Sequence, residues 1–330
     1  MNDTIRQTAP FPPARLLPAV KPLDLRKFQD PERTATGEKR ASVALCELRT
    51  LWFNTGTLCN LTCKNCYIES SPANNRLAYL SAAEARGFLD EIARENLPTR
   101  EIGFTGGEPF MNPEIIAMLE DALSRGFRAL VLTNAMKPMA NLKEPLLALR
   151  REHGPRLAIR VSLDHYSAAL HESERGTRSF APTLGGLRWL SQNGFDVCVA
   201  GRTCWNEPEQ SLREGYARLF SEHGIRVNAN DPVALMLFPE MDSGADVPEI
   251  TENCWNILGV SPDDMMCASA RMVVKRKGAE HPTVLACTLI AYDARFEMGA
   301  TLAEAAAPIS LNHPHCAKFC VLGGGACSRA

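Results

Sequence analysis

Between residues 49 and 230, short apolar segments alternate with longer segments in which apolar and polar residues recur at helical spacing. The short segments have the length of buried strands, and the longer ones end at glycine or asparagine, as helices do. The predicted strands are 49–54, 101–105, 127–133, 157–163, 195–202 and 225–230, and the predicted helices are 81–96, 112–126, 142–152, 183–192 and 208–223. Six strands that alternate with helices predict an α/β fold with a parallel sheet.

The regions on either side lack this alternation. Residues 1–45 are rich in proline and charge, which predicts an arm that wraps the domain or stays mobile. Residues 46–235 form the predicted strand–helix core. Residues 236–330 contain half of the twelve cysteines of the chain and are predicted to form a small cysteine-rich domain.

Composition excludes several classes of partner. A formal net charge of −2 gives no electrostatic reason to expect binding to nucleic acid or to an anionic membrane. No apolar run reaches the roughly 18 residues of a membrane span, and residues 1–20 lack the apolar stretch of a secretory signal. Twelve cysteines in a chain without a recognisable secretory signal indicate metal or redox chemistry rather than a disulfide framework. We therefore expect a cytoplasmic protein.

Three cysteines follow the first predicted strand at close spacing. Cys59, Cys63 and Cys66 form a C-x3-C-x2-C run, which brings three thiolates to one metal centre if the backbone curls around it. Four cysteines fill the iron positions of a structural [4Fe-4S] cluster, so three leave one iron open to a small molecule. A zinc site completed by a distant cysteine or histidine is the alternative, although zinc sites usually have paired C-x2-C units.

A glycine-rich turn follows the second predicted strand. Gly106, Gly107 and Glu108 stand in Thr105–Pro109, where the glycines let backbone amides and carbonyls approach a ligand and the carboxylate is placed to neutralise a cation. Together, this turn and the cysteine run resemble the radical SAM superfamily. The resemblance implies a partial (β/α)6 barrel related to the TIM barrel, with a [4Fe-4S] cluster on Cys59, Cys63 and Cys66 and S-adenosylmethionine as cofactor.

The resemblance also assigns polar residues at later strand ends. Asn134 and Ser162 correspond to family positions that contact the ribose and methionine parts of the cofactor, and Arg202 is a candidate partner for a carboxylate of cofactor or substrate. Asp164 is either a cofactor contact or the cap of the next helix. The residue before the third cysteine is commonly aromatic in the family and lies beside the adenine, whereas here it is Asn65.

The C-terminal cysteines resemble the auxiliary-cluster domains called SPASM and Twitch. A C-x3-C-x6-C run, together with two earlier cysteines, supplies ligands for a second [4Fe-4S] cluster. The candidates are Cys267, Cys287, Cys316, Cys320 and Cys327. A zinc knuckle and buried free thiols are the alternatives.

The predicted function is that of a radical SAM oxidoreductase or maturase. The resemblance implies reductive cleavage of S-adenosylmethionine to a 5′-deoxyadenosyl radical, which abstracts hydrogen from a small-molecule or peptide substrate. A flavodoxin or ferredoxin would supply the electron, and the net reaction would be an oxidation or a maturation step. The alternative from another class is a non-catalytic iron–sulfur or zinc-binding redox sensor.

Overall fold

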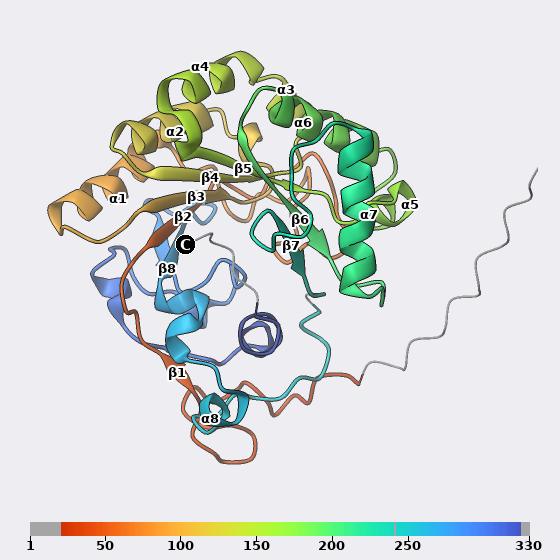
Figure 1. Ribbon diagram of the computed structural model, residues 1–330. Helices are drawn as coiled ribbons and strands as arrows, with labels where there is room; N and C mark the ends of the chain where they lie inside the picture. The colour runs from red at the N-terminus through yellow and green to blue at the C-terminus, as the bar shows by residue number, and fades with distance from the viewer. Residues whose placement is uncertain (1–20, 241, 325–330) are drawn as a thin grey trace, which may run out of the picture.

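A twisted eight-stranded sheet forms the centre of the computed structural model, which describes residues 21–240 and 242–324 (Figure 1). The strand order is β7-β6-β5-β4-β3-β2-β8-β9, and every neighbouring pair is parallel except β8 and β9. The strands are β2 (Thr50–Asn54), β3 (Glu101–Thr105), β4 (Arg128–Thr133), β5 (Leu157–Ser162), β6 (Asp196–Arg202), β7 (Leu235–Phe238), β8 (Ala270–Val274) and β9 (Thr283–Leu285). The predicted α/β fold with a parallel sheet is confirmed.

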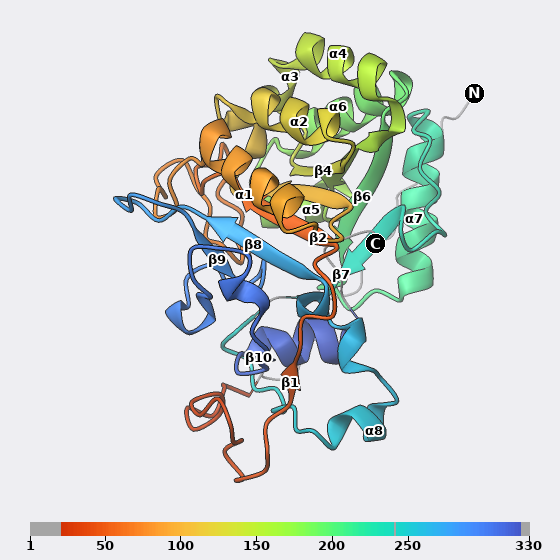
Figure 2. The ribbon, with the colours of Figure 1, turned by 90° about the vertical axis from the view of Figure 1, so that its left-hand side faces the viewer.

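Helices cover one face of this sheet and the C-terminal region covers the other (Figure 2). The helices of the core are α1 (Ala82–Arg94), α2 (Ile115–Ser124), α3 (Lys137–Ala140), α4 (Lys143–His153), α5 (Ala168–Arg175), α6 (Phe180–Gln192) and α7 (Glu209–Glu222). Ser81 caps α1 in a capping box with Glu84, and a Ser followed three residues later by Glu is the usual sequence signature of such a helix start. The predicted helices differ from these only in their ends, and α3 and α5 were not predicted.

Side-chain alternation along the strands explains the two layers. Leu51 and Phe53 pack with the helices, whereas Trp52 belongs to the apolar cluster formed with the C-terminal region. Gly103 on β3 lies directly beside Trp52, and a Cβ there would come within 2.2 Å of the indole ring. Both faces of the sheet are therefore buried, which explains why its strands are apolar throughout.

One predicted strand is wrong. Residues 225–230 form no strand. The sixth core strand is β7, which begins at Leu235, after the end of the predicted strand. Asn228 and Asp231 form turns instead, because the Asn228 side chain accepts from the Asn230 amide (3.0 Å) and the Asp231 side chain accepts from the Val233 amide (2.8 Å). These turns precede β7. None of the residues Asn228, Asn230 and Asp231 lines the cavity described below.

The C-terminal region contributes β8 and β9 to the central sheet and also forms smaller elements. Strand β10 (Ile309–Ser310) pairs antiparallel with β1 (Ser42–Val43). The remaining helical elements are α8 (Cys254–Leu258), a π-helix (Cys316–Val321) and short 3₁₀ turns at Pro109–Met111, Gly154–Arg156, Pro262–Asp264, Met266–Ala268, Ala294–Phe296 and Glu304–Ala306.

The predicted arm is described from residue 21 onwards, and residues 1–20 lie outside the described part. Its described portion packs on the C-terminal region, where Arg40 forms an ion pair with Glu249 and Lys27 forms one with Asp246. Where the structure describes the chain, none of its helices has both the length and the apolar character needed to cross a bilayer.

Candidate active site and second cysteine site

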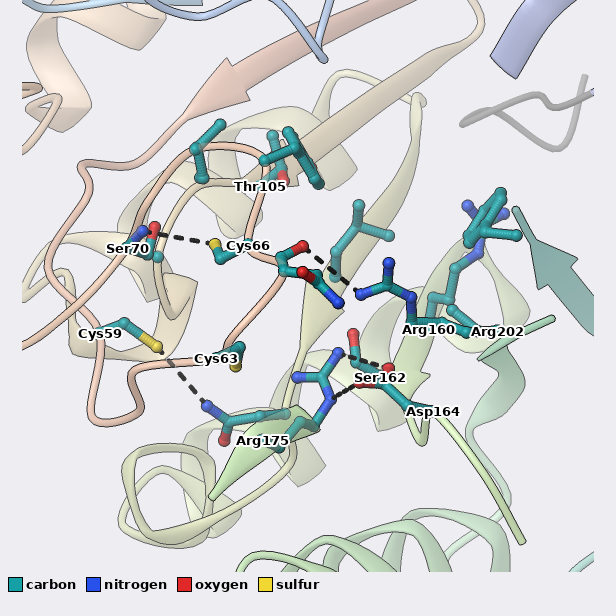
Figure 3. Close-up of a pocket in the computed structure, with 18 of the residues that line it drawn as sticks. Cys59, Cys63, Cys66, Ser70, Thr105, Arg160, Ser162, Asp164, Arg175 and Arg202 are labelled. Carbon is teal, nitrogen blue, oxygen red and sulfur yellow. Dashed lines mark hydrogen bonds and ion pairs between the residues drawn. The ribbon is translucent and has the colours of Figure 1, made fainter. Parts of the chain in front are cut away.

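A cavity of about 1160 Å³, its open mouth included, lies at the carboxyl ends of β3, β4, β5 and β6. Functional groups gather at this edge in parallel α/β folds. Its walls include most of the residues predicted for the first cluster and its cofactor: Cys59, Cys63, Cys66, Gly106, Gly107, Asn134, Ser162 and Arg202. In Figure 3, the three cysteines lie on one side, and Ser162, Asp164 and Arg202 lie on the other.

The cysteine loop leaves the end of β2 and curls around the cavity. Cys59 is 5% exposed, and Cys63 and Cys66 are partly buried. Backbone amides point at two of the sulfurs, because Leu61 donates to Cys59 Sγ (3.4 Å) and Ser70 donates to Cys66 Sγ (3.3 Å). Burial raises the pKa of Cys59 to about 12 and that of Cys63 above its usual value. These thiols therefore hold their protons until a metal displaces them.

Helix α5 fixes the far side of this loop. The Glu174 backbone carbonyl accepts from the Lys64 amide (2.7 Å), and its carboxylate accepts from the Asn65 side chain (2.8 Å). Arg202 lies close to both, with Nη1 at 3.4 Å from the Asn65 carbonyl and 3.8 Å from the Glu174 carboxylate. The Nη2 atom of Arg202 is buried and has no hydrogen-bond partner among the described residues. It is available to an anionic group of a ligand.

The two glycines serve a purpose that the sequence did not predict. A Cβ on Gly107 would lie 2.1 Å from the Leu58 carbonyl oxygen, and one on Gly106 would lie 2.5 Å from the Gly56 carbonyl oxygen. The Gly107 amide donates to that Gly56 oxygen (2.8 Å). Gly106 also has a φ of +136°, which side-chain-bearing residues rarely adopt. The glycines thus let the cysteine loop pack against the end of β3.

Glu108 lies behind the cavity wall and is not among the residues that line it. It is 1% exposed, and its carboxylate accepts hydrogen bonds from the Thr133 hydroxyl (2.8 Å), the Asn134 amide (2.8 Å) and the Phe110 amide (3.2 Å). Burial raises its pKa to about 7 against the opposing effect of these donors. The carboxylate therefore connects the ends of β3 and β4 and places a titratable charge next to the site.

A buried ion pair in the cavity wall was missed by sequence reasoning. Arg175 on α5 binds Asp164 through two contacts of 2.9 Å, one from Nε and one from Nη2. Asp164 is 3% exposed and makes no helix cap, because α5 has Ser167 as its N-cap residue. The capping alternative for Asp164 is therefore wrong. Arg175 ends a short helix next to Cys63 and Cys66, and Arg160 on β5 adds a third arginine to the wall.

An aromatic side chain is also present beside the cysteines. Asn65 and Tyr67 both line the cavity, together with the apolar side chains of Leu132 and Phe238. Tyr67 is thus a candidate for the stacking position that Asn65 leaves vacant in the family pattern.

Four of the five C-terminal candidate cysteines converge on a second, smaller cavity. Cys267, Cys287, Cys316 and Cys320 all line it, although they come from three separate segments of the sequence. Cys316 and Cys320 come from one π-helix and share a face. Cys327, the fifth candidate, lies outside the described residues. Cys254 is not part of this cavity, and its sulfur lies 3.4 Å from the Thr251 hydroxyl.

The second cavity is smaller than the first, at about 400 Å³, and its lining is apolar. Its other walls come from residues such as Met265, Ile290, Phe296 and Leu311, with His315 as the polar exception. Burial raises the pKa of Cys316 to about 12 and that of Cys267 to about 11. Leu289 lines both cavities, so the two cysteine sites are separated by a single layer of side chains at this point.

Residues 53–217, half of the chain, match the family model of the radical SAM superfamily. The chain therefore belongs to the radical SAM superfamily, whose cofactors are a [4Fe-4S] cluster and S-adenosylmethionine. The expected resemblance to its subgroup with a SPASM- or Twitch-type auxiliary domain is also confirmed, by the cysteine-rich C-terminal region and by the likeness to AlbA described next.

The curated relatives are considerably longer than this chain. The antilisterial bacteriocin subtilosin biosynthesis protein AlbA of Bacillus subtilis is 31% identical over 174 residues, which is 51% of this chain and 37% of AlbA. The AdoMet-dependent heme synthase of Methanosarcina barkeri is 28% identical over 138 residues, which is 42% of this chain and 37% of the synthase. The chain thus matches little more than a third of the length of either relative.

A solved structure shares the fold. Streptococcus suis SuiB bound to its precursor peptide SuiA superposes with a TM-score of 0.57 at 13% identity, covering 78% of this chain and 63% of SuiB. At this identity the likeness concerns the fold alone. It extends beyond the residues matched by the family model and therefore includes part of the C-terminal region.

Proposed function

We propose that this protein is a radical SAM maturase that modifies a peptide, with a catalytic cluster in the larger, open cavity and an auxiliary cluster in the smaller one. The observation that carries the proposal is the pair of cysteine sites: three thiols in a large cavity that also has polar side chains in its wall, and four in a smaller apolar one. Three protein ligands leave an iron open to a small molecule, whereas four complete a cubane. A non-catalytic sensor would not need the open site.

The residues of the open cavity fit the family cofactors. Cys59, Cys63 and Cys66 would hold the cluster, and the amides of Leu61 and Ser70 would continue to donate to its sulfur ligands. When bound, the reduced cluster supplies the electron that cleaves S-adenosylmethionine into methionine and a 5′-deoxyadenosyl radical. The chain holds the cofactor in place and keeps water and other hydrogen donors out.

Polar groups around the cavity would orient the cofactor. Asn134 and Ser162, at the ends of β4 and β5, would contact its ribose and methionine parts, and the backbone of Gly106 and Gly107 would border its amino group. Glu108 would provide the opposite charge from behind the wall. The unpaired Nη2 of Arg202 would receive a carboxylate of the cofactor or of the substrate.

The smaller cavity would hold the auxiliary cluster on Cys267, Cys287, Cys316 and Cys320. The Leu289 amide donates to Cys287 Sγ (3.3 Å), as expected for a cluster ligand. Because Leu289 and Phe319 also line the open cavity, an electron from a substrate radical would have only a short path to this cluster. A flavodoxin or ferredoxin would reduce the catalytic cluster.

The relatives favour a peptide over a small metabolite. AlbA is named for bacteriocin biosynthesis, and SuiB is described in complex with a precursor peptide. The heme synthase relatives, at lower identity, represent the small-molecule alternative.

The test uses the full chain, reconstituted with iron and sulfide without oxygen and then reduced. Replacing Cys59, Cys63 and Cys66 together by Ala should abolish formation of 5′-deoxyadenosine and lower the iron content from about eight to about four atoms per chain. The matched control is Cys46→Ala, since Cys46 is exposed and lies outside both cavities. Undiminished cleavage in the triple variant would overturn the assignment.

The substrate is tested by isotope transfer. Short peptides encoded beside the gene would be made fully deuterated, and deuterium should appear in 5′-deoxyadenosine after incubation with the reduced parent protein. Transfer from a deuterated porphyrin instead of from any peptide would favour the small-molecule alternative.

A further inference from the structure

A fully buried arginine lies next to the smaller cysteine cavity. Arg271, on β8, is 1% exposed. Its guanidinium donates to four backbone carbonyl oxygens, those of Cys267 (2.6 Å), Ala270 (2.8 Å), Ala305 (2.8 Å) and Ala307 (3.4 Å). The side chain is therefore held rigidly, with one of its contacts on the backbone of a predicted cluster ligand.

Arg271 has no acidic partner in the described part of the chain. Within residues 21–240 and 242–324, no carboxylate oxygen lies within 4.0 Å of its nitrogens, whereas the buried Arg40 is paired with Glu249 and the largely buried Arg175 with Asp164. A buried cation without a counter-anion is energetically costly. The groups that favour its charged form are the thiols of Cys267 and Cys287, while burial lowers its pKa to about 10.

We propose that Arg271 supplies the countercharge of the auxiliary cluster and raises the reduction potential of that cluster. This inference rests on the proposed function, in which Cys267, Cys287, Cys316 and Cys320 bind a [4Fe-4S] cubane. Four thiolates and an oxidised cubane core together carry a net negative charge, which the guanidinium offsets. The missing anion beside Arg271 is thus the cluster itself.

The electrostatic effect has a definite sign. One-electron reduction adds one negative charge to the cluster, with no bond made or broken and no proton required. A fixed positive charge in a low-dielectric interior stabilises the more negative, reduced state, so the potential rises. A higher potential suits a cluster that accepts an electron from a substrate radical in the adjoining cavity, across Leu289.

The experiment measures the potential in the full chain carrying the Cys59→Ala, Cys63→Ala and Cys66→Ala substitutions, which would retain only the auxiliary cluster. Arg271→Met should lower the midpoint potential, followed by EPR during a dithionite titration, by at least 59 mV, a tenfold change in the one-electron equilibrium constant. Arg271→Lys keeps the charge and should shift the potential much less. Lys318→Gln is the control, because Lys318 lies between two of the cysteines but is partly solvated.

Each outcome separates the two proposals. Full iron content with an unchanged potential in Arg271→Met would overturn the role of Arg271 and leave the auxiliary cluster standing. Absence of iron from the triple cysteine variant would overturn the auxiliary cluster itself. If Arg271→Met does not fold, Arg271→Gln still donates to the carbonyls without the charge, and it should show the same drop; a parent-like potential there would also overturn the proposal.

Discussion

The two cysteine sites of this protein differ in every property that decides what a metal cluster can do. The first has three cysteines in a wide cavity with polar walls, and its buried cation Arg175 is already neutralised by Asp164. The second has four cysteines in a small apolar cavity, and its buried cation Arg271 has no carboxylate partner among the described residues. In the proposed function, the first site would admit a ligand beside its cluster and the second would hold its cluster alone.

The comparison shows how ligand count and charge balance act together. In the proposed function both sites hold a permanent cluster, but the first also takes S-adenosylmethionine, which comes and goes during turnover. The second site would hold its cluster alone, so that Arg271 would always have an anion beside it. A buried arginine without an anion is therefore a useful sign of a permanent anionic group.

The largest expected effect separates the two sites by iron content. Gly107→Ala should displace the cysteine loop, because the new Cβ would approach the Leu58 carbonyl oxygen to 2.1 Å. We expect the reconstituted variant to lose the iron of the first site while keeping about four atoms at the second. The measurement is iron analysis with EPR of the reduced protein.

The control for this change is Gly185→Ala on α6, where an added Cβ meets no atom within 4 Å. It should bind iron like the parent. Parent-like iron content in Gly107→Ala would mean that the loop tolerates the extra methyl and that its position does not depend on this packing.

A smaller effect concerns the ion pair of the first site. Arg175→Met leaves the Asp164 carboxylate buried without its partner, so the unfolding free energy of the metal-free protein should fall by about 3–5 kcal/mol. Urea denaturation followed by circular dichroism measures the change. Arg178→Met, at an exposed position of the same segment, should have almost no effect.

The double variant Arg175→Met with Asp164→Leu sharpens this test. Because it removes both charges, it should recover most of the lost stability. If Arg175→Met alone is as stable as the parent, the pair is not a balanced part of the first site and the contrast with Arg271 is lost.

The smallest effect concerns the charge behind the cavity wall. Glu108→Gln should weaken binding of S-adenosylmethionine by about 1.5 kcal/mol, the lower end of the range for a charge-assisted hydrogen bond, because the carboxylate acts on the cofactor from behind the wall. Since the pKa of Glu108 is about 7, only its ionised form attracts the cation, and the parent should lose affinity as the pH falls through 7. Between pH 8 and pH 6 the loss should be about tenfold.

EPR titration of the reduced cluster with the cofactor gives both affinities. Glu108→Gln has no charge to lose and should show a flat pH profile over the same range. A parent whose affinity does not change with pH, or a variant that binds as tightly as the parent, would remove Glu108 from cofactor binding.

Local patterns were enough to predict most of the core. The strands from β2 to β6 and the cap of α1 at Ser81 follow from apolar runs and from a capping pair that lie close together in the sequence. Strand β7 was misplaced because the apolar residues at 225–229 resemble a strand until the turns at Asn228 and Asp231 are considered. Short-range turn chemistry prevailed there over hydrophobicity.

The site was predictable only where its residues stand in a motif. Cys59, Cys63 and Cys66 lie within eight residues, whereas Arg175 ends an unpredicted helix whose sequence looks like any solvated surface. Which C-terminal cysteines meet depends on β8 joining the sheet and on the π-helix, neither of which has a local signal. The sequence around Arg271 does not indicate its burial, because the segments that cover it lie far away in the sequence.

The central claim is that one site admits a ligand and the other does not, and EPR of the reduced protein during addition of S-adenosylmethionine tests it most directly. We predict that the cofactor changes the signal of one cluster in the parent and leaves the signal of the triple Cys59, Cys63 and Cys66 variant unchanged. A cofactor-dependent change in that variant would show that the second site also has an iron that can bind the cofactor, and it would contradict the account.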